Sequence, residues 1–259
     1  MALLEVRDLS KNFGGLAAIT RLNFDVSDGE ILGLIGPNGA GKTTLFNIIT
    51  GFFPPDMGKI LFEGKNITHL KPHKVAQRGI GRTFQLTTLC IRSSVFVNVF
   101  AGFHLNYKVN VWKAFLHFSS ARKEEETMKE RAMKILEFMG IASLKDELAR
   151  NLPHGHQRIL GVCIALATNP KLLFLDEPMT GMNPEETATL VSLVKKIRDD
   201  GVTIVVVEHD MKAIMKLCDR IMVMNFGEKI AEGLPNEIKE NKDVIEAYLG
   251  REETLVDVA

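Results

Sequence analysis

Hydrophobic and polar positions change their spacing along this chain, from strand-like runs at both ends to a helical period in the middle. Near the N-terminus, apolar runs between turn residues predict strands at Leu3–Arg7, Phe24–Val26, Ile31–Ile35 and Lys59–Phe62. After Lys171, runs of the same kind alternate with helical stretches and predict strands at Leu172–Leu175, Thr203–Val207 and Ile221–Met224, with helices from Pro184 and from Asp210. This alternation predicts an α/β fold.

The middle of the chain, from about Lys71 to Ala149, is richer in helical periodicity. Its clearest predicted element is Ala121–Met139, and Gly140 is placed to end that helix. Its apolar face is formed by Met128, Ala132, Ile135, Leu136 and Met139. We therefore expect one domain over residues 1–250, with a core at about 1–84 and 168–250, a helical insert at about 85–167 and a tail at 251–259.

Composition narrows the functional classes. Lys plus Arg and Asp plus Glu number 32 each, so no overall charge would attract nucleic acid, and no nucleic-acid partner is predicted. The longest stretch without a formal charge is Ser93–Tyr107, which is shorter than the roughly 20 apolar residues of a membrane-spanning helix. The first residues lack the pattern of a signal peptide. We predict a cytoplasmic protein that reaches a membrane through a partner, with Cys90, Cys163 and Cys218 as small core residues.

The strongest chemical signal is a glycine-rich sequence between the strand Ile31–Ile35 and a predicted helix. It has the pattern G-x-x-x-x-G-K-T and consists of Gly36, Pro37, Asn38, Gly39, Ala40, Gly41, Lys42 and Thr43, with Thr44 next to it. The glycines let backbone N–H groups point inward and form an anion site at the start of the helix. Lys42 can reach the β- and γ-phosphates of a nucleotide, and the Thr43 hydroxyl can hold Mg²⁺. The sequence therefore predicts a nucleoside-triphosphate site.

Two adjacent carboxylates follow the apolar strand Leu172–Leu175. Successive side chains of a strand point to opposite sides, so Asp176 and Glu177 cannot do the same job. The simplest division gives Asp176 to the Mg²⁺ shell and Glu177 to the attacking water. In isolation such a pair would be read as a solvated acidic turn. An α/β sheet, however, binds ligands beyond the C-terminal ends of its strands, where both this pair and the glycine-rich loop are predicted to lie.

With these motifs in this order, the chain resembles the nucleotide-binding subunits of ATP-binding-cassette transporters. Five further segments match that family in order, namely Phe13, Gln85, Leu152–Arg158, Gly181–Asn183 and His209. The resemblance implies that Phe13 stacks on adenine and that His209 steadies the γ-phosphate. It also implies that Gln85 reaches Mg²⁺, the water and a membrane partner. Taken singly, Gln85 would be an ordinary surface residue, His209 a structural histidine and Phe13 a core residue.

The resemblance also implies a fold and an assembly. The expected fold is a P-loop nucleotide-binding core with an antiparallel β subdomain and an inserted α-helical subdomain. Two such subunits close head to tail over two ATP molecules, and each pocket borrows the signature segment Leu152–Arg158 of the other subunit. The loop Gly181–Asn183 crosses the boundary between the two subunits.

The signature departs from the commonest family form, Leu-Ser-Gly-Gly-Gln. The residues at its centre are His154, Gly155, His156 and Gln157, so the serine that normally touches phosphate is missing. We expect a helix to begin near His156. Its backbone N–H groups, or the side chain of His154, would then contact the partner's nucleotide. A metal site at the two histidines is not favoured, because no cysteine or acid accompanies them at metal-ligand spacing.

This signature variant, the segment Gly181–Thr187, the long insert after Gln85 and the closing Ala247–Gly250 resemble the ATPases of branched-chain amino-acid importers. The resemblance implies permease subunits, a second ATPase subunit, identical or different, and an external substrate-binding protein. It places the chain on the inner face of the cell membrane. The alternatives are an importer ATPase for urea, amides or other amino acids, an export ATPase for lipid-like cargo, and a non-transport ATPase.

Overall fold

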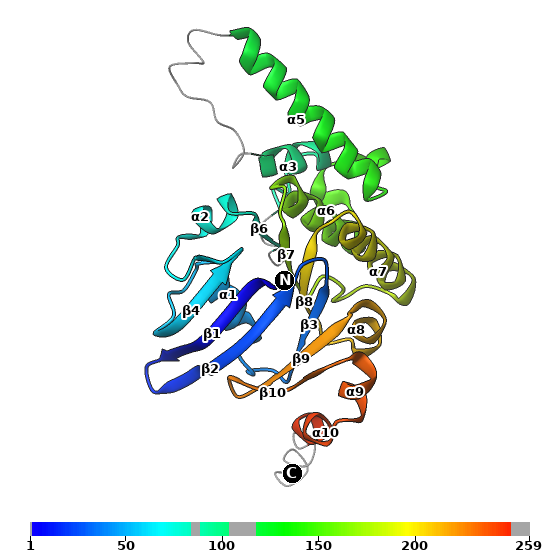
Figure 1. Cartoon of the computed structure of the whole chain (residues 1–259). Helices are drawn as coiled ribbons and strands as arrows, with labels where there is room; N and C mark the ends of the chain where they lie inside the picture. The colour runs from blue at the N-terminus through cyan, green and yellow to red at the C-terminus, as the bar shows by residue number, and fades with distance from the viewer. Residues whose placement is uncertain (1, 84–88, 104–117, 250–259) are drawn as a thin grey trace.

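Two β-sheets form the scaffold of the protein. The computed structural model describes residues 2–83, 89–103 and 118–249, with the backbone alone at 118–121 and 249. The strands are β1 (Ala2–Phe13), β2 (Leu16–Ser27), β3 (Ile31–Ile35), β4 (Met57–Phe62), β5 (Lys65–Asn66), β6 (Ile80–Arg82), β7 (Leu172–Asp176), β8 (Thr203–Val207), β9 (Arg220–Asn225) and β10 (Glu228–Gly233). One sheet is antiparallel with the order β2-β1-β4-β5, and the other has the order β10-β9-β3-β8-β7-β6 (Figure 1).

The larger sheet is parallel from β9 to β6, with β10 antiparallel at one edge. Every residue of β3, β7 and β8 is buried. These strands are continuous apolar runs because a parallel sheet is covered on both faces. Since the three strands are parallel neighbours, their C-terminal ends lie along one edge, where the glycine-rich loop and the residues after β7 and β8 emerge.

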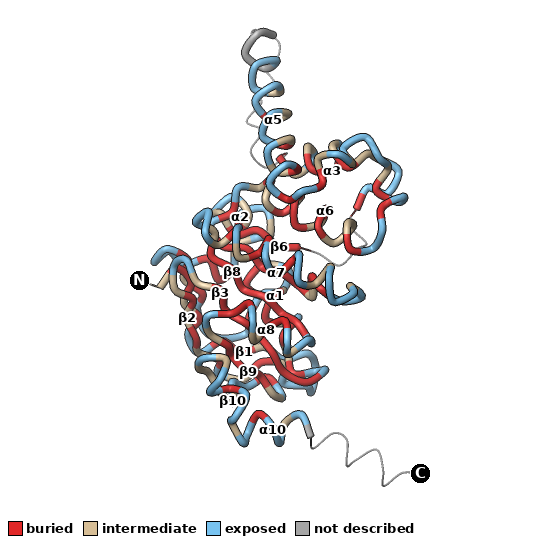
Figure 2. The backbone as a smooth tube through the Cα atoms, turned by 90° about the vertical axis from the view of Figure 1, so that its right-hand side faces the viewer, coloured by how far each residue is buried: buried red, intermediate tan, exposed pale blue. Residues whose placement is uncertain are grey.

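Helices cover both faces of the larger sheet. The helices of the described residues are α1 (Lys42–Ile49), α2 (Pro72–Gln77), α3 (Val95–Gly102), α5 (Phe118–Phe138), α6 (His154–Ala167), α7 (Pro184–Asp199), α8 (Met211–Leu217), α9 (Pro235–Glu240) and α10 (Lys242–Leu249), with short 3-10 turns at Ala142–Leu144 and Ala149–Asn151. One face packs with α1 and the antiparallel sheet, where the rings of Phe46 and Phe174 meet edge to face at 4.8 Å. The other face packs against α6, α7 and α8. Buried backbone follows the strands through the centre of the molecule (Figure 2).

The predicted fold class is confirmed: an α/β core, an antiparallel sheet and helices inserted between β6 and β7 are all present. In Figure 1, α5 extends away from the sheets at one end of the molecule, and α10 lies at the other. The helix α7 begins as predicted at Pro184. Its cap is Asn183, whose side chain accepts the N–H of Glu186 while the Glu186 carboxylate accepts the N–H of Asn183. The division into a core, an insert and a tail stays a prediction.

Several predictions of detail were wrong. Strands β1 and β2 each run for 12 residues, well past the predicted Leu3–Arg7 and Phe24–Val26. The helix α6 begins at His154 rather than near His156, because Pro153 already takes the cap position. Cys163 and Cys218 are buried as predicted, but Cys90 is exposed. In the described ranges, no helix is both long enough and apolar enough to span a bilayer.

Candidate functional site

The glycine-rich loop turns sharply from β3 into α1. Gly36 and Gly41 both have positive φ, 152° and 101°, a conformation that side chains disfavour. Space forbids a side chain as well. A Cβ on Gly36 would lie 2.1 Å from the Met224 carbonyl oxygen, and one on Gly41 would lie 2.6 Å from the Ala18 carbonyl oxygen. Both glycines are therefore required by close backbone contacts with β9 and β2, which fix the course of the loop.

The start of α1 offers donors to an anion. The cap residue Gly41 has no side chain to bond the first N–H groups, and no acid lies in the first turn. Lys42 is 6% exposed, and its ammonium donates to the carbonyl oxygens of Gly36 at 2.6 Å and Pro37 at 3.0 Å. The Lys42 ammonium thus lies within the curve of the glycine-rich loop. Uncapped N–H groups, a helix dipole and a lysine together favour a phosphate here.

Asp176, at the end of β7, is held by a buried arginine. The Arg82 guanidinium donates to Asp176 Oδ2 at 2.8 Å, and the two side chains are 7% and 6% exposed. Arg82 also donates to Asn47 Oδ1 at 2.7 Å and to Thr50 Oγ1 at 3.2 Å, on and beside α1. The Thr83 hydroxyl accepts the N–H of Asp176 at 3.1 Å. One carboxylate oxygen of Asp176 is thereby fixed, and the strand end is tied to α1.

Sequence reasoning missed Arg82. The sequence did contain a signal for it: Arg82 is a charged residue directly after the apolar strand residues Ile80 and Gly81. A cation buried in a sheet needs an acidic partner. The identity of that partner depends on the parallel pairing of β6 with β7, which aligns Arg82 with Phe174. Nothing in the local sequence around Arg82 specifies this pairing.

Glu177 and His209 lie on neighbouring strand ends and contact each other. His209 Nε2 is 2.8 Å from Glu177 Oε1, and both side chains are partly exposed. The N–H of Glu177 donates to the Val207 carbonyl at 2.9 Å, so its backbone continues the pairing of β7 with β8. Glu177 nevertheless has φ of 48°, which is strained for a residue with a side chain. The structure thus brings together a carboxylate and an imidazole that the sequence separates by 32 positions.

Phe13 is an exposed aromatic at the end of β1. Its ring is 43% exposed and makes an edge-to-face contact with Phe53 at 5.5 Å. The Lys11 ammonium lies 5.4 Å from the centre of the same ring. Phe13 pairs with Leu16 at the start of β2, the strand whose Ala18 packs on the glycine-rich loop. The ring is therefore available for stacking, and the reading of Phe13 as a core residue is not supported.

The signature residues form the first turn of α6. The cap Pro153 provides no side-chain bond to the N–H groups of this turn, and the turn itself contains no acid, although Glu186 of α7 lies beside Gly155. The Gln157 amide donates back to the Leu152 carbonyl at 2.9 Å. The Nδ1 atom of His156 is buried without a hydrogen-bond partner. Of the four central residues, only His154 is exposed.

This turn packs against the loop that precedes α7. A Cβ on Gly181 would lie 3.0 Å from the His154 imidazole, and a Cβ on Gly155 would lie 2.6 Å from Glu186 Oε1. The two predicted segments, Leu152–Arg158 and Gly181–Asn183, are therefore in direct contact. Gln85, predicted to contact Mg²⁺ and a partner, lies outside the described residues.

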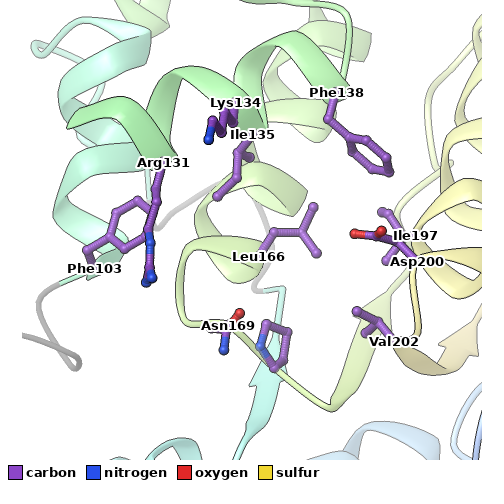
Figure 3. Close-up of a pocket in the computed structure, with 11 residues that line it drawn as sticks. Phe103, Arg131, Lys134, Ile135, Phe138, Leu166, Asn169, Ile197, Asp200 and Val202 are labelled. Carbon is purple, nitrogen blue, oxygen red and sulfur yellow. The ribbon is translucent and has the colours of Figure 1, made fainter. Parts of the chain in front are cut away.

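A separate cavity of about 400 Å³ lies among α5, α6 and α7. Figure 3 shows Leu166 at its centre, with Arg131 and Asp200 on opposite sides. Asn169 precedes β7 and Val202 precedes β8, so the cavity lies at the N-terminal ends of the strands. The glycine-rich loop and the carboxylates lie at the C-terminal ends, where α/β proteins bind their ligands. This cavity is therefore not part of the candidate site.

The chain is similar to ATP-binding proteins of transporters over nearly its full length. The ABC transporter family profile matches residues 19–180, and a profile described as branched-chain amino acid ATP-binding cassette transporter matches residues 228–254. The high-affinity branched-chain amino acid transport ATP-binding protein LivG of Escherichia coli is 40% identical over 96% of this chain and 98% of its own length. The lipopolysaccharide export system ATP-binding protein LptB of Escherichia coli is 32% identical over 97% and 99%. A crystal structure of an ABC transporter's ATP-binding cassette in its ADP conformation has a TM-score of 0.86 and 33% identity, with 96% and 99% covered.

Proposed function

Because this chain belongs to the ABC transporter family of ATP-binding proteins, we propose that it is the subunit whose ATP hydrolysis powers uptake of branched-chain amino acids. ATP binding and ATPase activity follow from membership of the family. The transported class rests on one observation, the 40% identity with LivG over nearly the full length of both chains. The match of residues 228–254 to the branched-chain profile supports it.

ATP binds along the C-terminal edge of the larger sheet. The proposed contacts to its phosphates are Gly36, Pro37, Asn38, Gly39, Ala40, Gly41, Lys42, Thr43 and Thr44. The buried Lys42 ammonium exchanges its two carbonyl partners for phosphate oxygens, which carry more charge. Adenine stacks on the exposed ring of Phe13. Stacking does not read the edge of the base, so this contact gives affinity without strong selection among nucleotides.

The donor set fits Mg²⁺. This hard cation prefers oxygen ligands, and the site offers the exposed Thr43 hydroxyl and the Asp176 carboxylate. The Arg82 guanidinium donates to Asp176 Oδ2, so we assign Oδ1 to the ion. We assign Thr43, Asp176 and Gln85 to the ion, which would neutralise charge on the β- and γ-phosphates.

Glu177 orients the attacking water. Its carboxylate is partly exposed at the strand end and is held by His209, which leaves it an acceptor for a water proton. When ATP is present, the His209 imidazole turns a nitrogen to the γ-phosphate and steadies it. Gln85 joins the pocket to the membrane partner. The catalytic set is therefore Glu177, His209 and Gln85.

The working unit contains two ATPase subunits on the inner face of the membrane, bound to permease subunits and served by an external binding protein. Each pocket is completed by His154, Gly155, His156 and Gln157 of the opposite subunit. We favour the backbone N–H groups of this turn over the His154 side chain as the phosphate contact. The reason is that the uncapped start of the 14-residue α6 is an anion site by itself.

An export role is the second candidate, favoured by the 32% identity with LptB. It is less well supported than import, because identity with LivG is higher over the same span. The decisive experiment reconstitutes the chain with its cognate permeases and binding protein in proteoliposomes. We expect leucine, isoleucine and valine to stimulate ATP hydrolysis, while urea and short amides do not. Stimulation by a lipid-like cargo, or by urea alone, would refute the import proposal.

The hydrolytic role is tested on the purified chain. Glu177→Gln should retain ATP binding, lose about 10²-fold in turnover, and accumulate as an ATP-bound dimer in size-exclusion chromatography. Glu228→Gln, at an exposed acid on β10, serves as the matched control and should behave as wild type. Wild-type turnover in Glu177→Gln would remove this residue from the mechanism.

A further inference from the structure

Glu208 is a buried acid with no role in the site described above. It stands between the end of β8 and His209, and it is 2% exposed. Burial raises the pKa of the Glu208 carboxyl, and no lysine or arginine of the described ranges forms an ion pair with it. An unpaired acid is costly to bury, whereas an apolar residue would fill the same space. The position therefore calls for an explanation beyond packing.

The carboxylate of Glu208 joins two segments through backbone hydrogen bonds. Oε1 accepts the N–H of Met179 at 2.5 Å, and Oε2 accepts the N–H of His209 at 3.2 Å. One side chain thus holds both the peptide that carries the histidine and the loop that follows Glu177. In the described ranges, no hydrogen bond runs directly from His209 to residues 178–183, so Glu208 is the bridge between them.

Met179 anchors the turns of that loop, which we call the connecting loop (residues 177–183). The N–H of Thr180 donates to the Glu177 carbonyl at 3.4 Å, and the N–H of Met182 donates to the Met179 carbonyl at 3.1 Å. The Met179 side chain is itself buried. A displacement of the Met179 peptide therefore shifts the rest of the loop as far as Asn183, where α7 begins.

The far side of the connecting loop touches the first turn of α6. The His154 imidazole packs on Gly181 and the Glu186 carboxylate packs on Gly155, with no room for a Cβ at either glycine without displacing its neighbour. The His154 imidazole lies against the backbone of Gly181, and Glu186, which lies against Gly155, also accepts the N–H of Asn183 at the end of the connecting loop. A continuous chain of contacts thus runs from His209 through Glu208 and Met179 to the start of α6.

We propose that Glu208 is a positioning residue that couples the Glu177–His209 pair to the first turn of α6 in the same chain. This inference rests on the proposed function in one respect: in a head-to-tail pair that turn serves the opposite pocket, so Glu208 links the two ATP sites. Movement of His209 toward phosphate pulls its peptide N–H and, through the shared carboxylate, the Met179 peptide. The first turn of α6 is then reset for the partner's nucleotide.

The first test measures ATPase activity against ATP concentration in the full chain. Glu208→Met keeps the volume without an acceptor, and Glu208→Gln keeps one acceptor oxygen. We expect Glu208→Met to bind ATP within about twofold of wild type. Its turnover should fall about tenfold and its Hill coefficient should approach one, with partial rescue in Glu208→Gln. Wild-type turnover and cooperativity in Glu208→Met would overturn the proposal, as would equal losses in Glu208→Met and Glu208→Gln.

A second test does not depend on dimers or transport. Glu208 and His154 make no direct contact, so their effects on the unfolding equilibrium of the single chain should add unless the loop couples them. We expect the double variant Glu208→Gln, His154→Ala to depart from additivity by about threefold or more in the unfolding equilibrium constant. Glu237→Gln, at an acid that accepts the Leu234 N–H at the start of α9, is the control and should add with His154→Ala.

Additivity in the Glu208 cycle would overturn the link even if the chain dimerises with ATP. Non-additivity would support the link within the chain even if the proposed transport function fails. The proposed function is tested separately, by the ATP-bound dimer of Glu177→Gln. The two failures are therefore distinguishable.

Discussion

Removing the buried cation beside Asp176 is expected to destabilise the protein severely. In Arg82→Met the side chain keeps much of its length, but the carboxylate of Asp176 loses its ion pair while both positions stay about 93–94% buried. The substitution also removes the bonds to Asn47 and Thr50 that tie β6 to α1. The expected phenotype comes from the stranded charge and not from lost volume.

The loss in free energy of unfolding can be worked out from the burial of this pair. Breaking a buried ion pair by deleting one partner costs about 3–5 kcal/mol, because the other charge is left uncompensated. In a chain of this size 1 kcal/mol corresponds to about 2–4 °C in melting temperature, so Arg82→Met should lower Tm by about 6–20 °C. When the charge is deleted from both positions, no uncompensated buried charge remains. The double variant Arg82→Met, Asp176→Asn should therefore recover much of the loss.

Urea and thermal unfolding of the four proteins in this cycle, followed by circular dichroism, give the measurement. Lys129→Met is the matched control, since the Lys129–Glu125 pair on α5 has side chains 44% and 47% exposed. An exposed pair in water contributes little, and this variant should unfold near the wild-type midpoint. A loss under about 1 kcal/mol in Arg82→Met, or a double variant no more stable than Arg82→Met, would show that the stranded charge of Asp176 is not what destabilises the protein.

Four further outcomes are expected. Lys42→Ala removes a charge-assisted phosphate contact of roughly 1.5–3 kcal/mol and should weaken ATP binding about ten- to hundredfold in a fluorescent-nucleotide titration. Phe13→Ala should weaken ATP and GTP alike in the same assay, and unchanged affinity would count against stacking. His154→Ala in the Glu177→Gln background should only mildly impair ATP-driven dimerisation by light scattering, and its abolition would assign the phosphate contact to the imidazole. Because burial raises the pKa of Glu208, its contribution to stability is largest at pH below the ordinary carboxyl range and declines as pH rises through the raised pKa. The difference in unfolding midpoint between wild type and Glu208→Gln, measured across pH 4–8, should show this decline.

The glycine-rich loop could be predicted from the sequence because its structure depends on residues that are neighbours in the chain. A buried strand, two obligatory glycines and a helix follow one another within the residues Ile31–Ile49, so the loop needs no distant partner to be recognised. The Asn183 cap is equally local, since its partners lie within three residues. Asp176 and Glu177 were expected at the same edge of the sheet as this loop, and β7 does end at Asp176.

Features that depend on long-range packing were not predictable in this way. Arg82 and Glu208 gain their partners across 94 and 29 positions, and only the strand order of the larger sheet brings them close. The lengths of β1 and β2 were underestimated for another reason. Polar residues such as Asp8 and Arg21 interrupt the apolar pattern, but both adopt positive φ at irregularities that let the strands continue. Pairing with a neighbouring strand thus overrides the local preference for a turn.

The strained backbone conformation of Glu177 matters when this protein is engineered for heat resistance. Its φ of 48° is a conformation that glycine or asparagine adopts more readily than glutamate. Sequence optimisation for stability would therefore select Glu177→Gly, which relieves strain of about 1–3 kcal/mol while deleting the carboxylate assigned to the water. The more stable variant would then lack ATPase activity, and a screen by melting temperature alone would rank it above the wild type. Variants at this position must therefore also be assayed for ATP turnover, because selection for thermal stability and selection for activity favour different residues here.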